Sequence, residues 1–277
     1  MQRWSIGILT GSSPLDLSPA QTCPVLSYQD VDDVPAEFVA DPFLVRRGDT
    51  WYMFFEIMNV STGKGDIGLA VSDDALHWQY CGVVLSESFH LSYPLVFSWQ
   101  GDHFMIPETL DLNGVCVYRA SKFPDVWERE GCILDGSFAD PTIFRFAEQW
   151  WLFACPRPDF HDTLSLFSSR DLMGPWRPHA KNPLISSDSR KARPGGRVIE
   201  HKGRLFRFTQ VCQPFYGTAV RAFEIETLNT QEYREKEAQR DPILDPSGHG
   251  WNADGMHHID AQVDSSGEII AAVDGLG

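Results

Sequence analysis

The sequence predicts an all-β protein that folds as a single five-bladed β-propeller domain spanning residues 1–277. The first observation is a hairpin pattern, an apolar strand, a turn and an aromatic strand, which recurs at a spacing of roughly 50 residues, as is typical of propellers. The second is a tryptophan after three of the copies, at Trp78, Trp127 and Trp176, at intervals of 49. Four copies align without gaps, each with fifteen positions from its first to its last residue: Asp41–Glu56, Tyr93–Glu108, Asp140–Cys155 and Gly195–Gln210.

Each hairpin continues into a third extended segment and a short fourth strand, which together make the four strands of a propeller blade. The segment 227–239 is rich in Glu, Gln and Arg and is compatible with a short outer helix. The fourth strands are expected at residues 83–86, 132–135, 183–186 and 242–245, so that the first four blades span residues 41–86, 93–135, 140–186 and 195–245.

A third observation concerns the two ends of the chain, which together supply the fifth blade. Residues 6–17 align without gaps on the third strand and tryptophan of the first blade, and residues 24–27 match the expected fourth strands. The missing inner hairpin is found at residues 257–263 and 268–273. The last blade is therefore predicted from residues 257–277 plus 3–27, closed by strands from both termini, because this closure leaves no exposed sheet edge.

Charge and composition narrow the classes of partner. The formal net charge of −15 argues against nucleic acid or an anionic membrane as partner. There is no apolar run of membrane-spanning length, and the N-terminal apolar stretch is too interrupted for a signal peptide. Six cysteines occur singly and are expected to be small buried residues rather than disulfides or zinc ligands, which favours a cytoplasmic location. The sequence makes no prediction of oligomeric state.

The repeat places a polar site at one mouth of the central channel. Inner strands begin at this mouth and second strands return to it, so that residues at these positions converge. The candidate catalytic residues are Asp41, Glu108, Asp140 and His258, and the candidate substrate-binding residues are Glu56, His90, Arg193, Arg197, His257 and Asp260.

Several of these residues have both a functional and a structural interpretation. Paired carboxylates suit glycosidic bond cleavage, although a strand-start aspartate can be a turn residue and Glu108 can form an ion pair with Arg193 or Arg197. The two arginines suggest a clamp for an anion or a sugar hydroxyl, or a structural salt bridge. His257 and His258 can be catalytic, can bind a single cation in the central channel, or can fill it. Asp260 shares a strand face with His258 and is expected to orient it. Beyond that possible cation, no metal site or cofactor is predicted.

The sequence also resembles a known family over roughly residues 38–275. It resembles the five-bladed furanosidase superfamily of glycoside hydrolase families 43, 32 and 68, and more closely the N-terminal domain of plant glucosamine inositolphosphorylceramide transferase and its stand-alone bacterial relatives. The resemblance is carried by Ala40–Phe43, Gly65–Gly68, Ser72-Asp73 with Trp78, His90–Pro94, Pro107-Glu108, Ala192–Arg197 and His257–Gln262.

The resemblance implies roles for three carboxylates. Asp41 would be the base or nucleophile, and Asp140 would be the pKa modulator and orienter. The general acid of the hydrolase families, a blade-four glutamate, is replaced here by Gly195-Gly196-Arg197. Glu108 is the best candidate for that acid, and Glu56 is the second candidate. In the plant protein, sugar transfer is attributed to a separate C-terminal glycosyltransferase domain.

Three functions are therefore compatible with the sequence. The leading hypothesis is a carbohydrate-active enzyme, a glycoside hydrolase or transglycosidase with a glycan or small-molecule substrate. The second is a non-catalytic glycan-binding or scaffold module that partners a glycosyltransferase. The third is an acid/base lyase or cyclase of a biosynthetic pathway that uses His258 with the acidic cluster.

Overall fold

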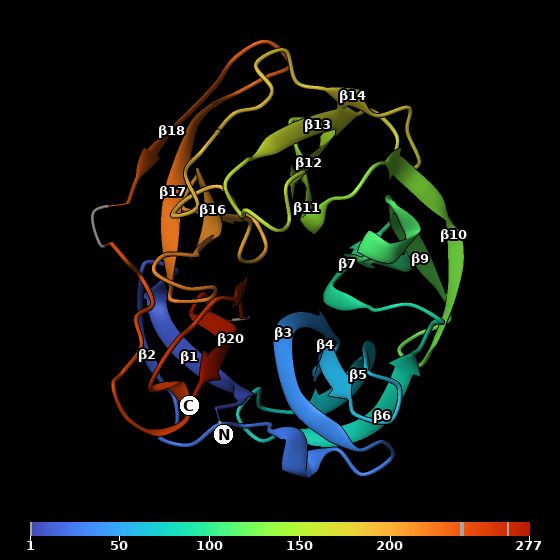
Figure 1. Ribbon diagram of the computed structural model, residues 1–277, viewed down its shortest axis with the longest axis vertical. Helices are drawn as coiled ribbons and strands as arrows, with labels where there is room; N and C mark the ends of the chain where they lie inside the picture. The colour runs from blue at the N-terminus through green and yellow to red at the C-terminus, as the bar shows by residue number, and fades with distance from the viewer. Residues whose placement is uncertain (1, 239–240, 265) are drawn as a thin grey trace.

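Five four-stranded antiparallel sheets stand around a central axis, in sequence order around the ring (Figure 1). This computed structural model describes residues 2–238, 241–264 and 266–277. The chain thus forms the all-β, five-bladed propeller that the repeats predict. Residues 239–240, which fall within the segment expected for the fourth blade, lie outside the described part of the chain.

Each blade consists of four strands, which follow one another in the sequence from the axis outwards in the first four blades. The first blade contains β3 (Ala36–Arg47), β4 (Thr50–Asn59), β5 (Lys64–Ser72) and β6 (Gln79–Leu85), and the second contains β7 (Ser92–Trp99), β8 (Asp102–Glu108), β9 (Gly114–Lys122) and β10 (Val126–Asp135). The third blade contains β11 (Ala139–Phe146), β12 (Gln149–Cys155), β13 (Ser165–Ser169) and β14 (Arg177–Pro178). The fourth contains β15 (Ile199–His201), β16 (Arg204–Val211), β17 (Ala219–Leu228) and β18 (Tyr233–Glu237). The fifth contains β19 (Ile259–Val263), β20 (Ile269–Leu276), β1 (Trp4–Ser13) and β2 (Asp16–Pro19).

Helical structure in the described ranges is limited to three short 3-10 turns, η1 (Tyr28–Asp30), η2 (Leu110–Leu112) and η3 (Gly250–Asn252). None of these helices is long and apolar enough to cross a membrane.

The fifth blade closes the ring with strands from both ends of the chain, as predicted. β1 pairs antiparallel with β20, from Trp4 opposite Leu276 to Gly11 opposite Ile269. The Arg3 N–H donates to the carbonyl of Gly277 at 3.0 Å, so that the two ends lie side by side. This pairing gives the C-terminal hairpin a neighbour on its outer side.

The repeated tryptophans support each blade from within. The indole N–H of Trp78 donates to the carbonyl of Ala75 at 3.0 Å, and that of Trp127 donates to Pro124 at 2.8 Å. The equivalent indole of Trp176 donates to Leu172 at 2.9 Å. Their apolar rings pack in clusters that contain residues of neighbouring blades, as where Trp127 contacts Phe54 of β4 with 5.5 Å between ring centres.

Three inner strands carry the same backbone distortion. Asp41, Tyr93 and Asp140 have φ values of 52°, 48° and 49°, and a register shift accompanies each of them. A left-handed conformation costs a non-glycine residue about 1–2 kcal/mol. Each of the three backbone N–H groups donates to a buried carboxylate, and these bonds offset the cost. The distortion is therefore tied to the acidic side chains at this end of the channel.

The outer strands of three blades differ from the prediction. The segments 24–27, 183–186 and 242–245 each form a single isolated bridge, through Leu26, Ile185 and Leu244, to the third strand or the residue before it. The fourth strands in these blades, β2, β14 and β18, lie earlier in the sequence. The predicted outer helix at 227–239 is wrong, because residues 219–228 and 233–237 pair as β17 and β18; residue 239 is not described.

The prediction for the cysteines is partly wrong. Cys116 and Cys132 face each other on β9 and β10 and form a disulfide, while Cys23 and Cys81 are exposed. Cys155 and Cys212 are free and buried, as expected. The repeat places Cys116 and Cys132 on neighbouring strands, but the register that pairs them is set by bulges that the sequence does not reveal. A cytoplasmic location remains a prediction, without support from the cysteines.

Candidate active site

The predicted carboxylates converge at the end of the central channel where inner strands begin and second strands end. We call this end the mouth. Asp41 and Asp140 come from the inner strands β3 and β11, and Glu56 and Glu108 lie towards the ends of β4 and β8. All four side chains are nearly buried, with residue exposures between 2% and 6%. They meet because antiparallel neighbours bring these strand ends to the same edge of every blade.

Arg193 links two of these carboxylates. Its guanidinium donates through Nε and Nη2 to both oxygens of Asp140, and Nη2 lies 3.6 Å from Glu108 Oε2. The amide of Gln210 donates to Asp140 Oδ2 at 2.7 Å. A third guanidinium nitrogen, Nη1, lies 2.8 Å from His161 Nδ1. Asp140 is therefore saturated with donors, and Arg193 is fixed as a buried cation.

Glu108 is held as a protonated acid. Burial and the nearby charge of Asp140 raise its pKa to about 8, although Arg193 acts in the opposite direction. Its Oε2 accepts the backbone N–H of Asp140 at 2.9 Å, and its Oε1 accepts the hydroxyl of Ser92 at 3.3 Å. At neutral pH this carboxyl group can donate a proton.

Asp41 is held ionised. Burial alone would raise its pKa, but hydrogen bonding and charge from His257, with His258 and Arg193 further away, lower it below the ordinary value. One oxygen accepts the backbone N–H of Tyr93 at 3.3 Å, and the other lies 3.3 Å from Nε2 of His257. Two carboxyl groups of one mouth therefore carry different charges at neutral pH.

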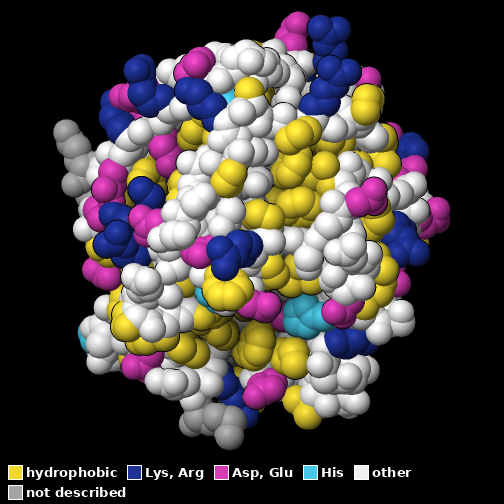
Figure 2. Space-filling model, turned by 45° about the horizontal axis from the view of Figure 1, so that its top comes forward, with side chains coloured by type: hydrophobic (Ala, Val, Ile, Leu, Met, Phe, Trp, Pro, Cys, Tyr) yellow, Lys and Arg dark blue, Asp and Glu magenta, His cyan; other side chains and the backbone are white. Residues whose placement is uncertain are grey.

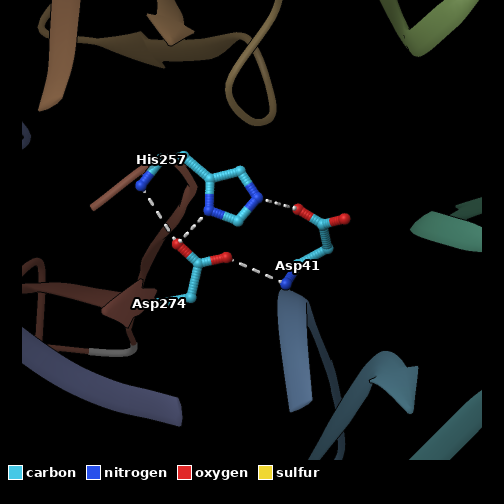
Figure 3. A group of neighbouring side chains, drawn as sticks. All are labelled: Asp41, His257 and Asp274. Atoms are coloured by element: carbon cyan, nitrogen blue, oxygen red, sulfur yellow. Dashed lines mark hydrogen bonds and ion pairs between the residues drawn. The ribbon is translucent and has the colours of Figure 1, made fainter. Parts of the chain in front are cut away.

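A carboxylate that the sequence interpretation does not include completes this part of the mouth. Asp274 at the end of β20 is fully buried, and Figure 3 shows it between His257 and the backbone of Asp41. It occupies the second-strand position that corresponds to Glu56 and Glu108. The expected hairpin ends at Val273, one residue short, which hides the match in the sequence.

Asp41, His257 and Asp274 are the described group whose ligand atoms lie close enough for a metal ion, all within 4.8 Å of one another. Their arrangement does not fit one. Asp274 lies 2.9 Å from Nδ1 of the imidazole and Asp41 lies 3.3 Å from Nε2, so that the carboxylates face different ring nitrogens (Figure 3). Since the lone pairs of these nitrogens point apart, a single ion cannot bind all three residues unless the ring turns.

Glu56 and His90 form a second pair at the rim of the mouth. The Gly65 N–H donates to His90 Nδ1 at 2.9 Å, which leaves the ring proton on Nε2, 3.3 Å from Glu56 Oε1. Burial, together with the charge of Asp41, raises the pKa of Glu56 well above its ordinary value, and burial lowers the pKa of His90.

Three predicted site residues lie deeper along the axis. Arg197 donates through Nε to Asp260 at 2.7 Å and through Nη2 to the carbonyl of Val96 at 2.9 Å. His258 is fully buried, with Nε2 donating to the carbonyl of Pro42 at 3.0 Å. Asp260 does not orient His258 as expected, because its contacts run to Arg197, the Leu44 N–H and Gln262.

The blade-four position has no room for an acid. A Cβ on Gly196 would lie 1.7 Å from the carbonyl oxygen of Ile259, and one on Gly195 would lie 3.0 Å from the backbone of Gln210 and His257. Gly196 also has a φ of 139°. The absence of a glutamate here is therefore a consequence of close backbone approach between blades four and five.

Exposed aromatic side chains lie on two loops beside this site. Tyr216 is 38% exposed, its ring lies 5.2 Å from that of His257, and the Arg193 guanidinium lies 5.1 Å from its centre. Phe160 and Phe215 are 60% and 49% exposed. On the face drawn in Figure 2, basic, acidic and histidine side chains gather near the centre among apolar ones.

Fold and site define a class, a five-bladed β-propeller with an acidic, histidine-bearing mouth. Solved structures share the fold. A thermostable family-43 glycoside hydrolase superposes with a TM-score of 0.62 at 13% identity, covering 89% of this chain and 91% of its own. The β-1,2-mannobiose phosphorylase from Listeria innocua gives 0.66 at 13% identity, with 96% of each chain covered.

Within that class, the chain belongs to the family described as glucosamine inositolphosphorylceramide transferase 1, N-terminal, which matches residues 2–276. It is 37% identical over 298 residues to glucosamine inositolphosphorylceramide transferase 1 of Oryza sativa subsp. japonica, with 98% of this chain and 40% of the relative covered. The Arabidopsis thaliana protein of the same name is 37% identical over 295 residues. The chain thus spans about two fifths of the length of these curated relatives.

Proposed function

We propose that the mouth binds a carbohydrate and cleaves or transfers a glycosidic bond, with Glu108 as general acid and Asp41 as base or nucleophile. The observation that carries this proposal is the contrast between two buried carboxyl groups of one site, Asp41 beside the His257 ring and Glu108 beside Asp140. The pKa of Asp41 is lowered by His257 despite burial, and the pKa of Glu108 is raised by burial to about 8. Glycoside cleavage requires one carboxylic acid and one carboxylate in this way.

The reaction would use the side chains as follows. Glu108 gives its proton to the glycosidic oxygen as the bond from that oxygen to the anomeric carbon breaks. Asp41 either takes a proton from an attacking water or hydroxyl, or attacks the anomeric carbon itself. Arg193 holds Asp140 and lies 3.6 Å from Glu108, so that it can restore the charge balance when Glu108 becomes an anion.

Substitution of the two carboxyl groups tests the proposal. With alkyl glycosides, Asp41→Asn and Glu108→Gln should each lower kcat/KM by roughly 10²–10⁴. Glu108→Gln should retain much more activity on glycosyl fluorides or dinitrophenyl glycosides, because these leaving groups need no acid. The matched control is Glu128→Gln on the exposed face of β10, which should act like the wild type. Equal losses on both substrate types would remove Glu108 from the acid role.

A non-catalytic glycan-binding module that partners a glycosyltransferase remains the second candidate. Two observations favour it: Gly195 and Gly196 occupy the blade-four acid position, and the matched relatives are about two and a half times as long as this chain. Sugar binding measured by calorimetry, without turnover of any glycoside in a broad panel, would support this candidate over the enzyme. Acid/base chemistry through His258 lacks such support, since its ring is fully buried and Nε2 is occupied by Pro42.

A further inference from the structure

The most heavily used acceptor of the mouth is Asp274. Its Oδ1 accepts the backbone N–H groups of His257 and His258 at 3.1 and 3.0 Å, and lies 2.9 Å from the ring Nδ1 of His257. Its Oδ2 accepts the backbone N–H of Asp41 at 3.0 Å. The Asp274 side chain thus accepts the backbone N–H groups of His257 and His258 in its own blade and lies beside the His257 ring, and it also accepts the backbone N–H of Asp41 in blade one.

This position requires a carboxylate. Three backbone N–H groups donate to the two oxygens of a side chain that is fully buried, and the ring Nδ1 of His257 lies 2.9 Å from one of these oxygens. An asparagine would offer one acceptor oxygen and would turn its NH₂ group towards either the Asp41 N–H or the His257 ring. A buried donor without an acceptor is costly, so that an asparagine could not keep both the contact with the Asp41 N–H and the contact with the His257 ring.

The His257 ring has little freedom to adopt another orientation. The indole of Trp4 packs against it with 4.2 Å between ring centres, and the Tyr216 ring lies 5.2 Å away. A Cβ on Gly217 would lie 3.2 Å from the Cβ of His257, which shows how closely that loop approaches. These neighbours hold the ring with Nδ1 2.9 Å from Asp274 and Nε2 3.3 Å from Asp41 (Figure 3).

We infer that Asp274 is a positioning residue that holds His257 and Asp41 as one unit, so that an imidazolium ring, and not a metal ion, is the cation beside Asp41. The ring lies between two carboxylates, one near each ring nitrogen, so that a proton on either nitrogen lies beside an anion. The role of Asp41 as base rests on the proposed function; the geometry and protonation of His257 do not.

The charged groups that face the ring support this assignment. Burial alone would lower the pKa of His257, but Asp274 and then Asp41 outweigh it and raise this pKa to about 10. The aromatic neighbours Trp4 and Tyr216 are uncharged at neutral pH. The imidazolium in turn holds the pKa of Asp41 low.

The direct test is nitrogen NMR of the full chain labelled with ¹⁵N-histidine. At pH 8, one histidine should show both ring nitrogens protonated, and His257→Gln should remove that signal. In Asp274→Asn the signal should change to that of a neutral ring. Asp66→Asn is the matched control, a buried aspartate whose partners are Asn59, Lys64 and Ser86. A neutral His257 in the wild type at pH 8, or no change in Asp274→Asn, would overturn the inference.

Addition of metal ions tests the alternative, that this group of residues binds a metal ion. Addition of Ca²⁺ or Zn²⁺ to the metal-free protein should leave the His257 signals and the Tm unchanged. A metal that raises the Tm of the wild type but not of Asp274→Asn, and that removes a proton from His257, would show a metal site instead. If Asp274→Asn does not fold, His257→Gln carries the test, because it removes the cation and leaves the backbone contacts of Asp274.

Kinetics separate this inference from the proposed function. Loss of the imidazolium should shift the acid limb of the pH profile of kcat/KM to higher pH by about 1–3 units. The reason is that a nearby opposite charge lowers the pKa of a carboxyl group, here Asp41, by about that amount. Glycosides that remain inert in the wild type, with the NMR signature present, would refute the proposed function and leave the inference intact. Glycoside turnover by a wild-type protein that lacks the NMR signature would refute the inference and leave the proposed function intact.

Discussion

At the scale of single residues, the mouth shows how neighbours decide the charge of similar groups. Asp41, Glu56 and Glu108 are buried to nearly the same extent. The pKa of Asp41 is lowered because His257 faces it, while the pKa values of Glu56 and Glu108 are raised by burial and by the other carboxylates. Burial therefore sets a common cost, and the balance of nearby positive and negative charges determines which group remains ionised.

The raised pKa of Glu108 predicts a dependence of stability on pH. Between its ordinary value of 4.5 and about 8, the folded state keeps a proton that the unfolded chain has lost, so that the free energy of unfolding should fall as the pH rises through this range. In Glu108→Gln the fall should be smaller, because an amide does not titrate. Urea unfolding at pH 5, 6, 7 and 8 measures this. Parallel curves for the variant and the wild type would contradict it.

The cysteines give a prediction that can be counted. Without denaturant or reductant, a thiol reagent should modify Cys23 and Cys81, which are exposed. With denaturant it should also reach Cys155 and Cys212, where burial raises the thiol pKa, for Cys212 to about 11. Mass spectrometry should thus find four modified cysteines in the unreduced protein. Six would mean that Cys116 and Cys132 are not joined.

Sequence reasoning identifies most residues of the mouth but not the contacts between them. The repeat places Asp41, Glu108 and Asp140 at strand ends that have to meet. It cannot indicate that Arg193 pairs with Asp140, because the segment before β15 leaves the repeat pattern and carries that arginine to its neighbour through a loop. The sequence does not predict Asp274 as a site residue for a simpler reason, because only the register of β19 and β20 reveals that it lies opposite the start of the hairpin.

At the scale of elements, the inner hairpins were predictable and the outer strands were not. Inner strands have continuous apolar sequences that are buried on both faces, and this pattern is strong. The outer strand β14 is short and exposed, and the outer strands of the other blades pair through bulges rather than by a hydrophobic pattern. The match of residues 24–27, 183–186 and 242–245 to one another is nevertheless real, because each makes the same single bridge.

Blade four provides an element-scale prediction. Gly196 donates its N–H to the Tyr93 hydroxyl at 2.7 Å and lies against β19, where a Cβ would be 1.7 Å from the carbonyl oxygen of Ile259. Gly196→Ala should destabilise the protein by about 3 kcal/mol or more. Gly203→Ala is the control, because Gly203 has a φ of 73° and open space around it, and should cost about 1 kcal/mol.

Denaturant unfolding midpoints of the two glycine variants, measured side by side, decide this point. If both lose stability equally, then backbone conformation alone matters, and the close approach of blades four and five does not exclude a side chain at Gly196.

At the scale of the whole molecule, one buried ion pair joins four blades. Arg197 comes from blade four and pairs with Asp260 of blade five, and its guanidinium also donates to Val96 of blade two and, at 3.4 Å, to Leu44 of blade one. Asp260 accepts the Leu44 N–H at 2.6 Å. We therefore interpret these two residues as the polar axis of the ring rather than as substrate contacts.

This axis predicts a non-additive mutant cycle. Asp260→Ala should destabilise the protein by about 3–5 kcal/mol, because it leaves the Arg197 charge buried without a partner. The double variant Asp260→Leu with Arg197→Met should cost less than that single change. Removal of the exposed pair between Lys122 and Asp125 is the control and should cost about 0–1 kcal/mol. Denaturant unfolding of all variants provides the test, and additive costs would refute the interpretation.

Ring closure also sets an order of events during synthesis. The backbone N–H of Asp41 is held by a carboxylate 233 residues further along the chain. At a ribosome speed of ~5–20 residues per second, roughly 12 to 47 seconds pass between the appearance of these two residues. During that interval the first four blades can form while the mouth lacks both His257 and its fifth carboxylate, Asp274. The mouth should therefore be complete only after β20 has emerged from the ribosome.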